Sequence, residues 1–185
     1  MKKLKRCPWP GNDPLMIEYH DTEWGVPLHD DRKIFEFIVL EGMQAGLSWA
    51  TVLRKRENFR KAYKGFDPQI VAKFTQRDLD RLLNDPGIIR NRLKIKASIA
   101  NASAFLAVQK EFGSFDKYMW QFVGGKPIKH RLRAISQMPA TSPESDRFSK
   151  DLKQRGFKFV GSTIIYAHMQ ATGMINDHLM SCFRY

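Results

Sequence analysis

Residues 82–96 have the sequence LLNDPGIIRNRLKIK. Asp85-Pro86-Gly87 is a turn signal, and the leucines and isoleucines around it predict a short helix before the turn and a longer one after it. A glycine-bearing turn exposes backbone N–H groups, and a helix N-terminus is a positive end that favours phosphate. The segment therefore resembles a helix-hairpin-helix unit that holds the DNA backbone without reading bases. The expected contacts are Gly87, Arg90, Arg92 and Lys94. The alternative is an ordinary solvated helix start.

The rest of the chain also has helical periodicity. Asp30-Asp31 caps a segment with apolar residues at helical spacing, and no useful strand-like alternation occurs. Further helices are expected at residues 48–64, 75–84, 91–112, 145–155 and 160–172. The predicted class is all-α.

Composition limits the kind of protein. Thirty-one Lys and Arg against nineteen Asp and Glu give a net charge of +12, which suits a polyanion such as nucleic acid. A length of 185 residues fits one domain, residues 1–185. No apolar run approaches a membrane span or a signal-peptide core, and only two cysteines occur. A cytoplasmic protein with no membrane partner is expected.

The two cysteines each have a histidine nearby. Cys7 and His20 lie near one end of the chain, and His178 and Cys182 lie near the other. Two thiolates and two imidazoles make a complete tetrahedral zinc set, which leaves no open position for catalysis. The spacing of His178 and Cys182 puts both on one face of a helical turn, if that segment is helical. Two reduced thiols and two unrelated histidines are the alternative.

Glu41 falls on an apolar stripe. The stripe Ile34, Phe37, Ile38 continues through position 41 to Ala45, so a carboxyl group occupies an expected core position. An unpaired buried carboxylate is costly and needs a partner or a task. It is either half of a buried ion pair with an arginine or a pocket group that recognises a cationic or hydrogen-bond-donating ligand.

Aromatic residues are abundant around Glu41. Trp9, Tyr19, Trp24 and Trp49 lie within about forty residues of it in the sequence. Aromatic faces stack on bases and attract cations, although most tryptophans simply pack in cores. A carboxyl group with several aromatics would suit a pocket for an everted, positively charged base.

These residues resemble a known family, the type I DNA-3-methyladenine glycosylases. The resemblance runs in order from Cys7 to Cys182. It is carried by DPL (13–15), YHDTEWGVP (19–27), LEG (40–42), QAGLSW (44–49), RKRENFR (54–60), GIIR (87–90), KQRGFKFVG (153–161) and NDH (176–178).

The resemblance implies a helix-hairpin-helix glycosylase with two helical lobes whose termini are joined by one structural zinc ion per chain. Cys7, His20, His178 and Cys182 would be its ligands. Glu41 would contact the adenine edge of a flipped 3-methyladenine and serve as the catalytic group. Tyr19 and Trp49 would stack around the base, with Trp9 and Trp24 nearby, and Leu47 would be the wedge that fills the gap in the duplex.

The resemblance also implies a monofunctional enzyme that acts as a monomer on double-stranded DNA containing alkylated bases, with no obligate protein partner. Most helix-hairpin-helix glycosylases carry a catalytic aspartate after the hairpin, and the type I family lacks it. Here the only acid between Asp85 and Asp116 is Glu111. Methylation at N3 makes the adenine cationic, so the base is already a good leaving group and needs little proton transfer.

Two features depart from the family. Some relatives carry a second tyrosine one turn before the histidine ligand, where this chain has Met16. The basic residues Lys2, Lys3, Lys5 and Arg6 extend beyond the family's usual start and are expected to form a disordered arm.

Two other classes of protein are alternatives, a DNA-binding module without catalysis and a zinc hydrolase or base deaminase. The His-x-Glu and Pro-Cys-x-x-Cys motifs of a deaminase are absent.

Overall fold

The computed structural model describes residues 4–185, and the described residues are mostly helical. The α-helices are α1 (Pro14–Thr22), α2 (Asp31–Gln44), α3 (Trp49–Arg54), α4 (Arg56–Ala62), α5 (Pro68–Val71), α6 (Gln76–Leu83), α7 (Arg92–Phe112), α8 (Phe115–Trp120), α9 (Pro143–Gln154) and α10 (Ser162–Ala171). Short 3-10 helices cover Lys64–Phe66, Gln121–Val123 and Ile135–Gln137. Two strands of two residues, β1 (Ile128–Lys129) and β2 (Ile175–Asn176), pair in parallel. The predicted all-α class is confirmed.

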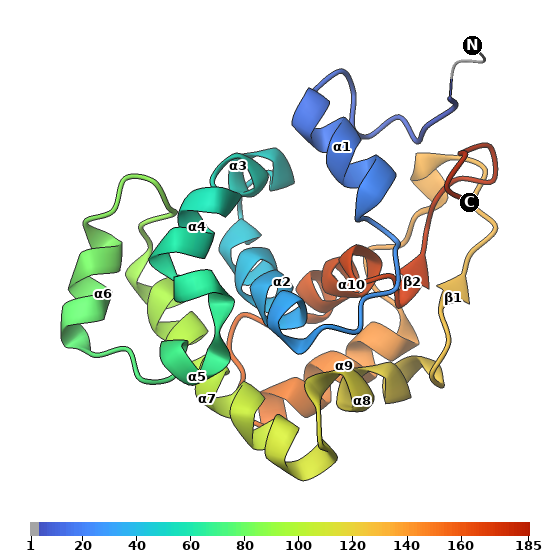
Figure 1. Cartoon of the computed structure of the whole chain (residues 1–185). Helices are drawn as coiled ribbons and strands as arrows, with labels where there is room; N and C mark the ends of the chain where they lie inside the picture. The colour runs from blue at the N-terminus through green and yellow to red at the C-terminus, as the bar shows by residue number, and fades with distance from the viewer. Residues whose placement is uncertain (1–3) are drawn as a thin grey trace.

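Helix α2 lies at the centre of the fold. It contacts α3 and α7 on one side and α8 and α10 on the other, and in Figure 1 it separates α3–α7 from α8–α10. Ten consecutive residues of α2, 34–43, are buried. A helix buried around most of its circumference can carry a polar group into the interior, and Glu41 lies on this helix.

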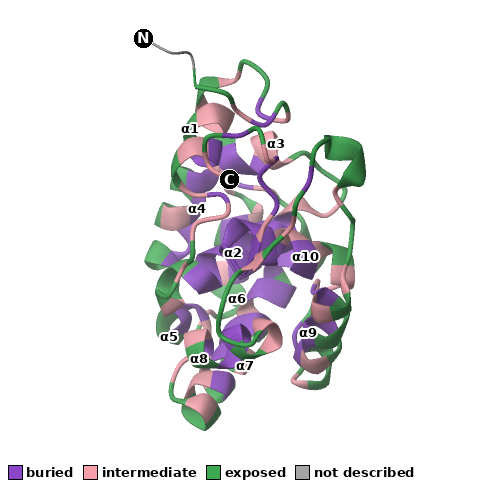
Figure 2. Cartoon of the chain, turned by 90° about the vertical axis from the view of Figure 1, so that its right-hand side faces the viewer, coloured by how far each residue is buried: buried purple, intermediate pink, exposed green. Residues whose placement is uncertain are grey.

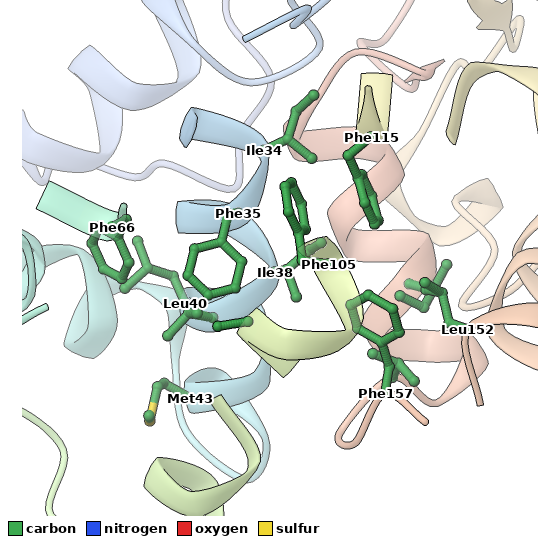
Figure 3. Packing of buried hydrophobic residues seen from close by; sticks show 14 of the residues in the cluster. Ile34, Phe35, Ile38, Leu40, Met43, Phe66, Phe105, Phe115, Leu152 and Phe157 are labelled. Atoms are coloured by element: carbon green, nitrogen blue, oxygen red, sulfur yellow. The ribbon is translucent and has the colours of Figure 1, made fainter. Parts of the chain in front are cut away.

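The main core surrounds α2 and the long helix α7. Figure 3 shows Phe35 and Leu40 of α2 close to Phe66, and Phe105 of α7 near Phe115. The Phe105 and Phe115 rings stack with centroids 4.1 Å apart. In Figure 2 the buried residues concentrate on α2 and α10, while the outer faces of the peripheral helices are exposed. The core therefore holds α2 rigidly between the two groups of helices.

Several predicted helix starts are confirmed by their caps. Asp30, Ser48 and Asn91 each accept a hydrogen bond from a backbone N–H of the first turn of α2, α3 and α7. A side-chain oxygen at this position satisfies one of the amide groups that a helix start leaves unpaired. The starts of α2 and α7 thus agree with the sequence to within one residue.

The predicted helix at 48–64 is wrong as a single element. It breaks at Lys55, whose backbone N–H bonds to Val52 O at 3.0 Å, so the chain continues as two helices, α3 and α4. Helices α1, α5 and α8 were not predicted; α5 and α8, with four and six residues, are too short for a clear period.

The segment before α2 runs close beside the end of α10. Gly25 N donates to Gln170 O at 2.9 Å and Leu28 N donates to Thr172 O at 3.0 Å. Gly173 has φ +69°, and a Cβ there would lie 2.3 Å from the backbone of Val26 and Pro27. The approach is so close that only glycine fits, and it joins the N-terminal segment to the C-terminal helix.

The two ends of the described chain also meet, because Phe183 N donates to Lys5 O at 2.8 Å. Within residues 4–185, no helix is long and apolar enough to cross a membrane.

Candidate active site and metal cluster

A cavity of about 220 Å³ lies where α1, α2 and α10 meet the N-terminal segment. This volume is smaller than the roughly 300–1,000 Å³ of a pocket for a drug-sized ligand. A second hollow shares Glu41 and Gln44 with it and extends to Gly46 and Leu47. The first cavity is lined by Trp9, Met16, Tyr19, Trp24, Glu41, Gln44, Trp49, Ile135, Met138, Ala167 and Gln170.

Glu41 is a buried wall of this cavity. Its exposed fraction is 4%, and no side chain or backbone group in residues 4–185 donates a hydrogen bond to its carboxyl group. Burial raises the pKa of the Glu41 carboxyl to about 8. A neutral or weakly ionised acid that faces a cavity is available for a ligand that donates hydrogen bonds or carries positive charge.

The ion pair that Glu41 could have made belongs to Glu36 instead. Arg56 Nε donates to Glu36 Oε1 at 2.5 Å, and Arg60 Nε donates to the same oxygen at 3.1 Å. Arg56 also donates to Glu23 Oε1 at 2.8 Å. The arginines near α2 are thereby used on another face of the helix, and the ion-pair interpretation of Glu41 is wrong.

The predicted aromatic residues all line the cavity. The rings of Tyr19 and Trp49 lie 5.3 Å apart, and those of Trp9 and Trp24 lie 5.1 Å apart. Behind them Phe37 stacks on Trp49 at 6.4 Å, with an interplanar angle of 19°. The cavity therefore combines flat apolar walls with one carboxyl group, which suits a planar cation.

Some lining residues escaped the sequence analysis. Gln44 and Gln170 bring amide groups to the cavity, and Ile135 and Met138 bring apolar atoms from the short 3-10 helix and the residue that follows it. Gln170 Nε2 donates to the buried carboxylate of Asp177 at 2.7 Å. Gln44 lies one turn after Glu41, so helical spacing could have indicated it, but nothing in the sequence signals Ile135 or Met138.

The four predicted metal ligands come together. The donor atoms of Cys7, His20, His178 and Cys182 all lie within 4.8 Å of one another, and all four residues are buried. Three sulfur–nitrogen distances are 3.5–3.7 Å. Tetrahedral zinc with ordinary bond lengths would place sulfur and nitrogen ligands about 3.6 Å apart. The cluster can hold a metal ion.

The surroundings of the cluster also fit a metal. His20 Nδ1 donates to Asp21 Oδ1 at 2.8 Å and His178 Nε2 donates to Trp24 O at 2.9 Å, which leaves one nitrogen of each ring facing the sulfurs. Such second bonds orient histidine ligands. Backbone N–H groups of Leu179 and Arg184 donate to Cys7 Sγ and Cys182 Sγ, each at 3.4 Å, and so provide hydrogen bonds to both sulfurs.

The expected helical turn at His178 and Cys182 is wrong. The segment after β2 is a loop in which Cys182 N donates to Leu179 O at 2.7 Å, a turn that brings both ligands to one side. The cluster touches the cavity directly, since the Trp9 ring lies 5.3 Å from the His20 ring and His178 holds the Trp24 carbonyl. The Cys7, His20, His178 and Cys182 cluster and the aromatic wall are thus one packed unit.

Residues 84–91 form the turn that joins α6 to α7. Arg90 and Arg92 are exposed there. The Gly87 amide, in contrast, donates to Asp85 Oδ1 at 2.7 Å, which corrects the expectation that it is free for phosphate. A Cβ at Gly87 would lie 2.9 Å from that oxygen and 3.1 Å from Asn58, so the glycine permits close packing of the turn.

Lys94 also differs from expectation. Its ammonium group is buried and donates to Met43 O and Ala45 O, so it does not face solvent as a phosphate contact must. Leu47 is 43% exposed at the tip of the turn between α2 and α3, as a wedge requires.

The prediction of a disordered basic arm is wrong for Lys5 and Arg6, because Phe183 N donates to Lys5 O at 2.8 Å and Arg6 is held by an ion pair. Arg6 pairs with Asp21, Nε to Oδ1 at 2.9 Å, and its guanidinium lies over the Phe183 ring, so it is not part of a free arm. Lys5 is exposed. Lys2 and Lys3 lie outside the described residues.

A turn between two helices with exposed arginines, an exposed leucine beside a cavity, and an aromatic pocket with an unpaired acid are features expected of an enzyme that excises a base from DNA. Comparison with known proteins specifies the family. Residues 9–185 match the model of the methyladenine glycosylase family, so the chain belongs to this family of hydrolases acting on N-glycosyl bonds.

The similarity extends over nearly the whole chain. It is 50% identical to DNA-3-methyladenine glycosylase 1 of Escherichia coli K12, covering 98% of this chain and 97% of that one. A crystal structure of a 3-methyladenine DNA glycosylase I superposes with a TM-score of 0.94 at 52% identity, covering 97% and 98% of the two chains. The 3-methyladenine DNA glycosylase I of Staphylococcus aureus, whose structure concerns 3-methyladenine recognition, has a TM-score of 0.94 at 36% identity and covers 98% and 96%.

Proposed function

We propose that this protein hydrolyses the N-glycosidic bond of 3-methyladenine in alkylated double-stranded DNA. Family membership and relatives named for this activity support the proposal. The observation that carries it is Glu41, a buried carboxyl group without a protein partner in the wall of an aromatic cavity. A binding platform has no use for such a group, whereas an enzyme that receives a cationic base does.

In the proposed complex the flipped base enters the cavity and packs against the rings of Tyr19 and Trp49, with Trp9 and Trp24 closing the wall. Stacking on aromatic faces contributes about 1–3 kcal/mol per base, and a cationic ring gains more from the same faces. Glu41 accepts a hydrogen bond from the adenine edge, and its negative charge neutralises the positive charge of the methylated base. An unmethylated adenine is neutral and gains less from both groups, which accounts for selection of the damaged base.

The chemical step needs little acid–base help. The bond between the sugar C1′ and the base nitrogen breaks, and both electrons go to the base, which leaves as neutral 3-methyladenine. A water oxygen bonds to C1′, and its proton goes to solvent or to the Glu41 carboxylate. In residues 86–115 the only acid is Glu111, and it pairs with Arg155 on the surface. Glu41 thus acts electrostatically on the developing sugar cation. Among the described residues no lysine lines the cavity, which supports a monofunctional enzyme.

DNA is held by the hairpin between α6 and α7. Arg90 and Arg92 neutralise phosphates, and the unpaired amides at the start of the 21-residue helix α7 add a positive end. Leu47 enters the base stack and fills the gap left by the flipped nucleotide.

The Cys7, His20, His178 and Cys182 cluster holds one structural zinc ion, which would supply cross-linking rather than chemistry, because four protein ligands leave no open position. The chain acts as a monomer in a single domain, without an obligate protein partner, in the cytoplasm.

The test is to incubate the purified protein with N-methylated duplex DNA and to identify the released bases by chromatography. Glu41→Gln is run beside it, with Glu36→Gln as a matched change at a buried glutamate outside the cavity. Free 3-methyladenine from the wild type and from Glu36→Gln, at temperatures where the latter is folded, but sharply less from Glu41→Gln, is expected. No released base from a folded protein that binds DNA would replace the glycosylase with a binding module.

A further inference from the structure

Lys94 makes an unusual connection in the interior. It lies in the first turn of α7 with an exposed fraction of 8%. Its ammonium group donates to Met43 O at 2.9 Å and to Ala45 O at 2.5 Å, some fifty residues earlier in the chain. No carboxylate in residues 4–185 pairs with it. A buried ammonium that is held only by carbonyl groups is costly, so it needs a task.

The two carbonyl groups mark the end of α2. The last carbonyls of a helix have no partner within it, and a positive charge stabilises this negative end. Helix α2 has no basic residue in its own last turn. Lys94 supplies that charge from α7.

These two carbonyl groups also lie where the turn that carries Leu47 begins. After Ala45 the chain reverses at Gly46, with φ +76°, and Leu47 N donates to Gln44 O at 2.6 Å. Lys94 therefore donates hydrogen bonds to the backbone where the turn of residues 44–48 begins. We call residues 44–48 the wedge turn. At the start of α7, Lys94 follows Arg92 by two residues.

We propose that Lys94 is a positioning residue that locks the wedge turn to the hairpin, so that Leu47 enters the duplex in register with the phosphate contacts of Arg90 and Arg92. The inference rests on the proposed function. In this proposal the buried Lys94 ammonium group couples two events, the binding of the DNA backbone and the opening of the base stack. Without it, the protein still binds the backbone and still accepts a free base, but extrudes the damaged base poorly.

Salt dependence separates this role from a direct phosphate contact. Affinity for a duplex containing a tetrahydrofuran abasic analogue is measured by fluorescence anisotropy at several salt concentrations. Losing one phosphate contact reduces the slope of log K against log salt by about 1. We expect an unchanged slope for Lys94→Met, as for the exposed-lysine control Lys110→Met at the far end of α7, and a reduced slope for Arg92→Met. A slope reduced by about 1 in Lys94→Met would overturn the positioning role.

A double-mutant cycle tests the coupling to Leu47. We expect Lys94→Met to lower the rate of 3-methyladenine release from methylated duplex DNA at least tenfold in the wild-type background. In the Leu47→Ala background the same change should cost less than about threefold, because the wedge that it positions is already gone. Binding of free 3-methyladenine, followed by tryptophan fluorescence, should stay within about twofold. If Lys94→Met lowers the rate by the same factor in both backgrounds, or if it abolishes binding of the free base, Lys94 has only a general structural role.

If Lys94→Met does not fold by circular dichroism, Lys94→Arg is put through the same cycle, because it keeps the charge but cannot place one nitrogen on both carbonyl groups. A wild type that releases no 3-methyladenine would defeat the proposed function and the positioning role with it. A wild type that releases it, matched in rate by the Lys94 variant, would defeat the positioning role alone.

Discussion

Glu36 and Glu41 lie five residues apart on α2 and are both buried, yet Glu36 is paired with Arg56 and Arg60 while Glu41 faces a cavity without a partner. One helix thus carries two buried acids with opposite requirements. The paired acid belongs to the scaffold, and the unpaired acid is available to a ligand. The same conservative change at the two positions should therefore give opposite results.

Glu36→Gln is expected to destabilise the protein. Removing one partner of a buried ion pair leaves the other charge uncompensated, and this typically costs about 3–5 kcal/mol. Chemical denaturation should show a free energy of unfolding lower by about 3 kcal/mol, with activity retained at temperatures where the variant is folded. A variant as stable as the wild type would mean that Arg56 finds enough support from Glu23 alone.

Glu41→Gln is expected to keep the fold and lose activity. The amide has nearly the same size but cannot carry the negative charge that a cationic base requires. Initial rates of 3-methyladenine release should fall at least tenfold, with an unchanged circular dichroism spectrum. Glu41→Asp, which keeps the charge on a shorter stem, should fall between the two. Rates near those of the wild type in Glu41→Gln would remove Glu41 from the chemistry.

Stability should depend on pH through Glu41. Its pKa is about 8 in the folded state and about 4.5 when the chain is unfolded, so the folded protein holds the proton more tightly. This stabilisation is complete below pH 4.5 and is lost as pH rises through 8, at up to roughly 1.4 kcal/mol per pH unit. Glu41→Gln lacks this loss, so its advantage over the wild type in free energy of unfolding should grow from pH 5 to pH 8. Parallel stability curves would contradict the burial of a protonated acid.

Activity should also depend on the ionisation of Glu41, but it should rise with pH where the stability falls. Because the carboxylate is the form that stabilises a cation, kcat/KM for release from methylated DNA should rise with pH, pass half its maximum near pH 8 and level off above that pH. Glu41→Gln should show no such rise. A wild-type profile that falls over this range would indicate that the protonated acid is the active form.

Metal removal should act on stability before it acts on turnover. Elemental analysis is expected to find one zinc per chain, and Cys182→Ala should lack it. The cluster closes a loop from residue 7 to residue 182, and by analogy with a disulfide closing a long loop the link is worth about 5 kcal/mol, or a Tm shift of 10 °C or more. Immediate loss of turnover from a chelated but folded protein would instead favour a catalytic metal.

The cavity should bind its base more tightly if Met16 becomes aromatic. Met16 lines the cavity together with Tyr19. Met16→Tyr adds a flat face, and a gain of about 1 kcal/mol tightens binding roughly fivefold. Titration with free 3-methyladenine, using Met16→Leu as the control, measures the change. Weaker binding would show that the extra ring fills the space that the base needs.

Much of the site was predictable because its residue types are scarce or out of place. Two cysteines and a carboxyl group on an apolar stripe stand out in any chain, and the structure brings the cysteines together with His20 and His178 and places Glu41 at the cavity. Helix starts were predictable where a side chain caps them, as at Asp30 and Asn91. Short helices such as α5 and α8 were missed because they contain too few turns to display a period.

The sequence by itself determined the helical class, the burial of Glu41 and the donor set of the metal cluster, because helical period and residue chemistry are local properties. Only the tertiary structure decided which acid the arginines neutralise and where the Lys94 ammonium goes. Arg56 reaches Glu36 across twenty residues, and Lys94 reaches the end of α2 across about fifty. A buried charge takes whichever partner the packing of distant helices brings within about 3 Å, and no spacing along the chain encodes that distance.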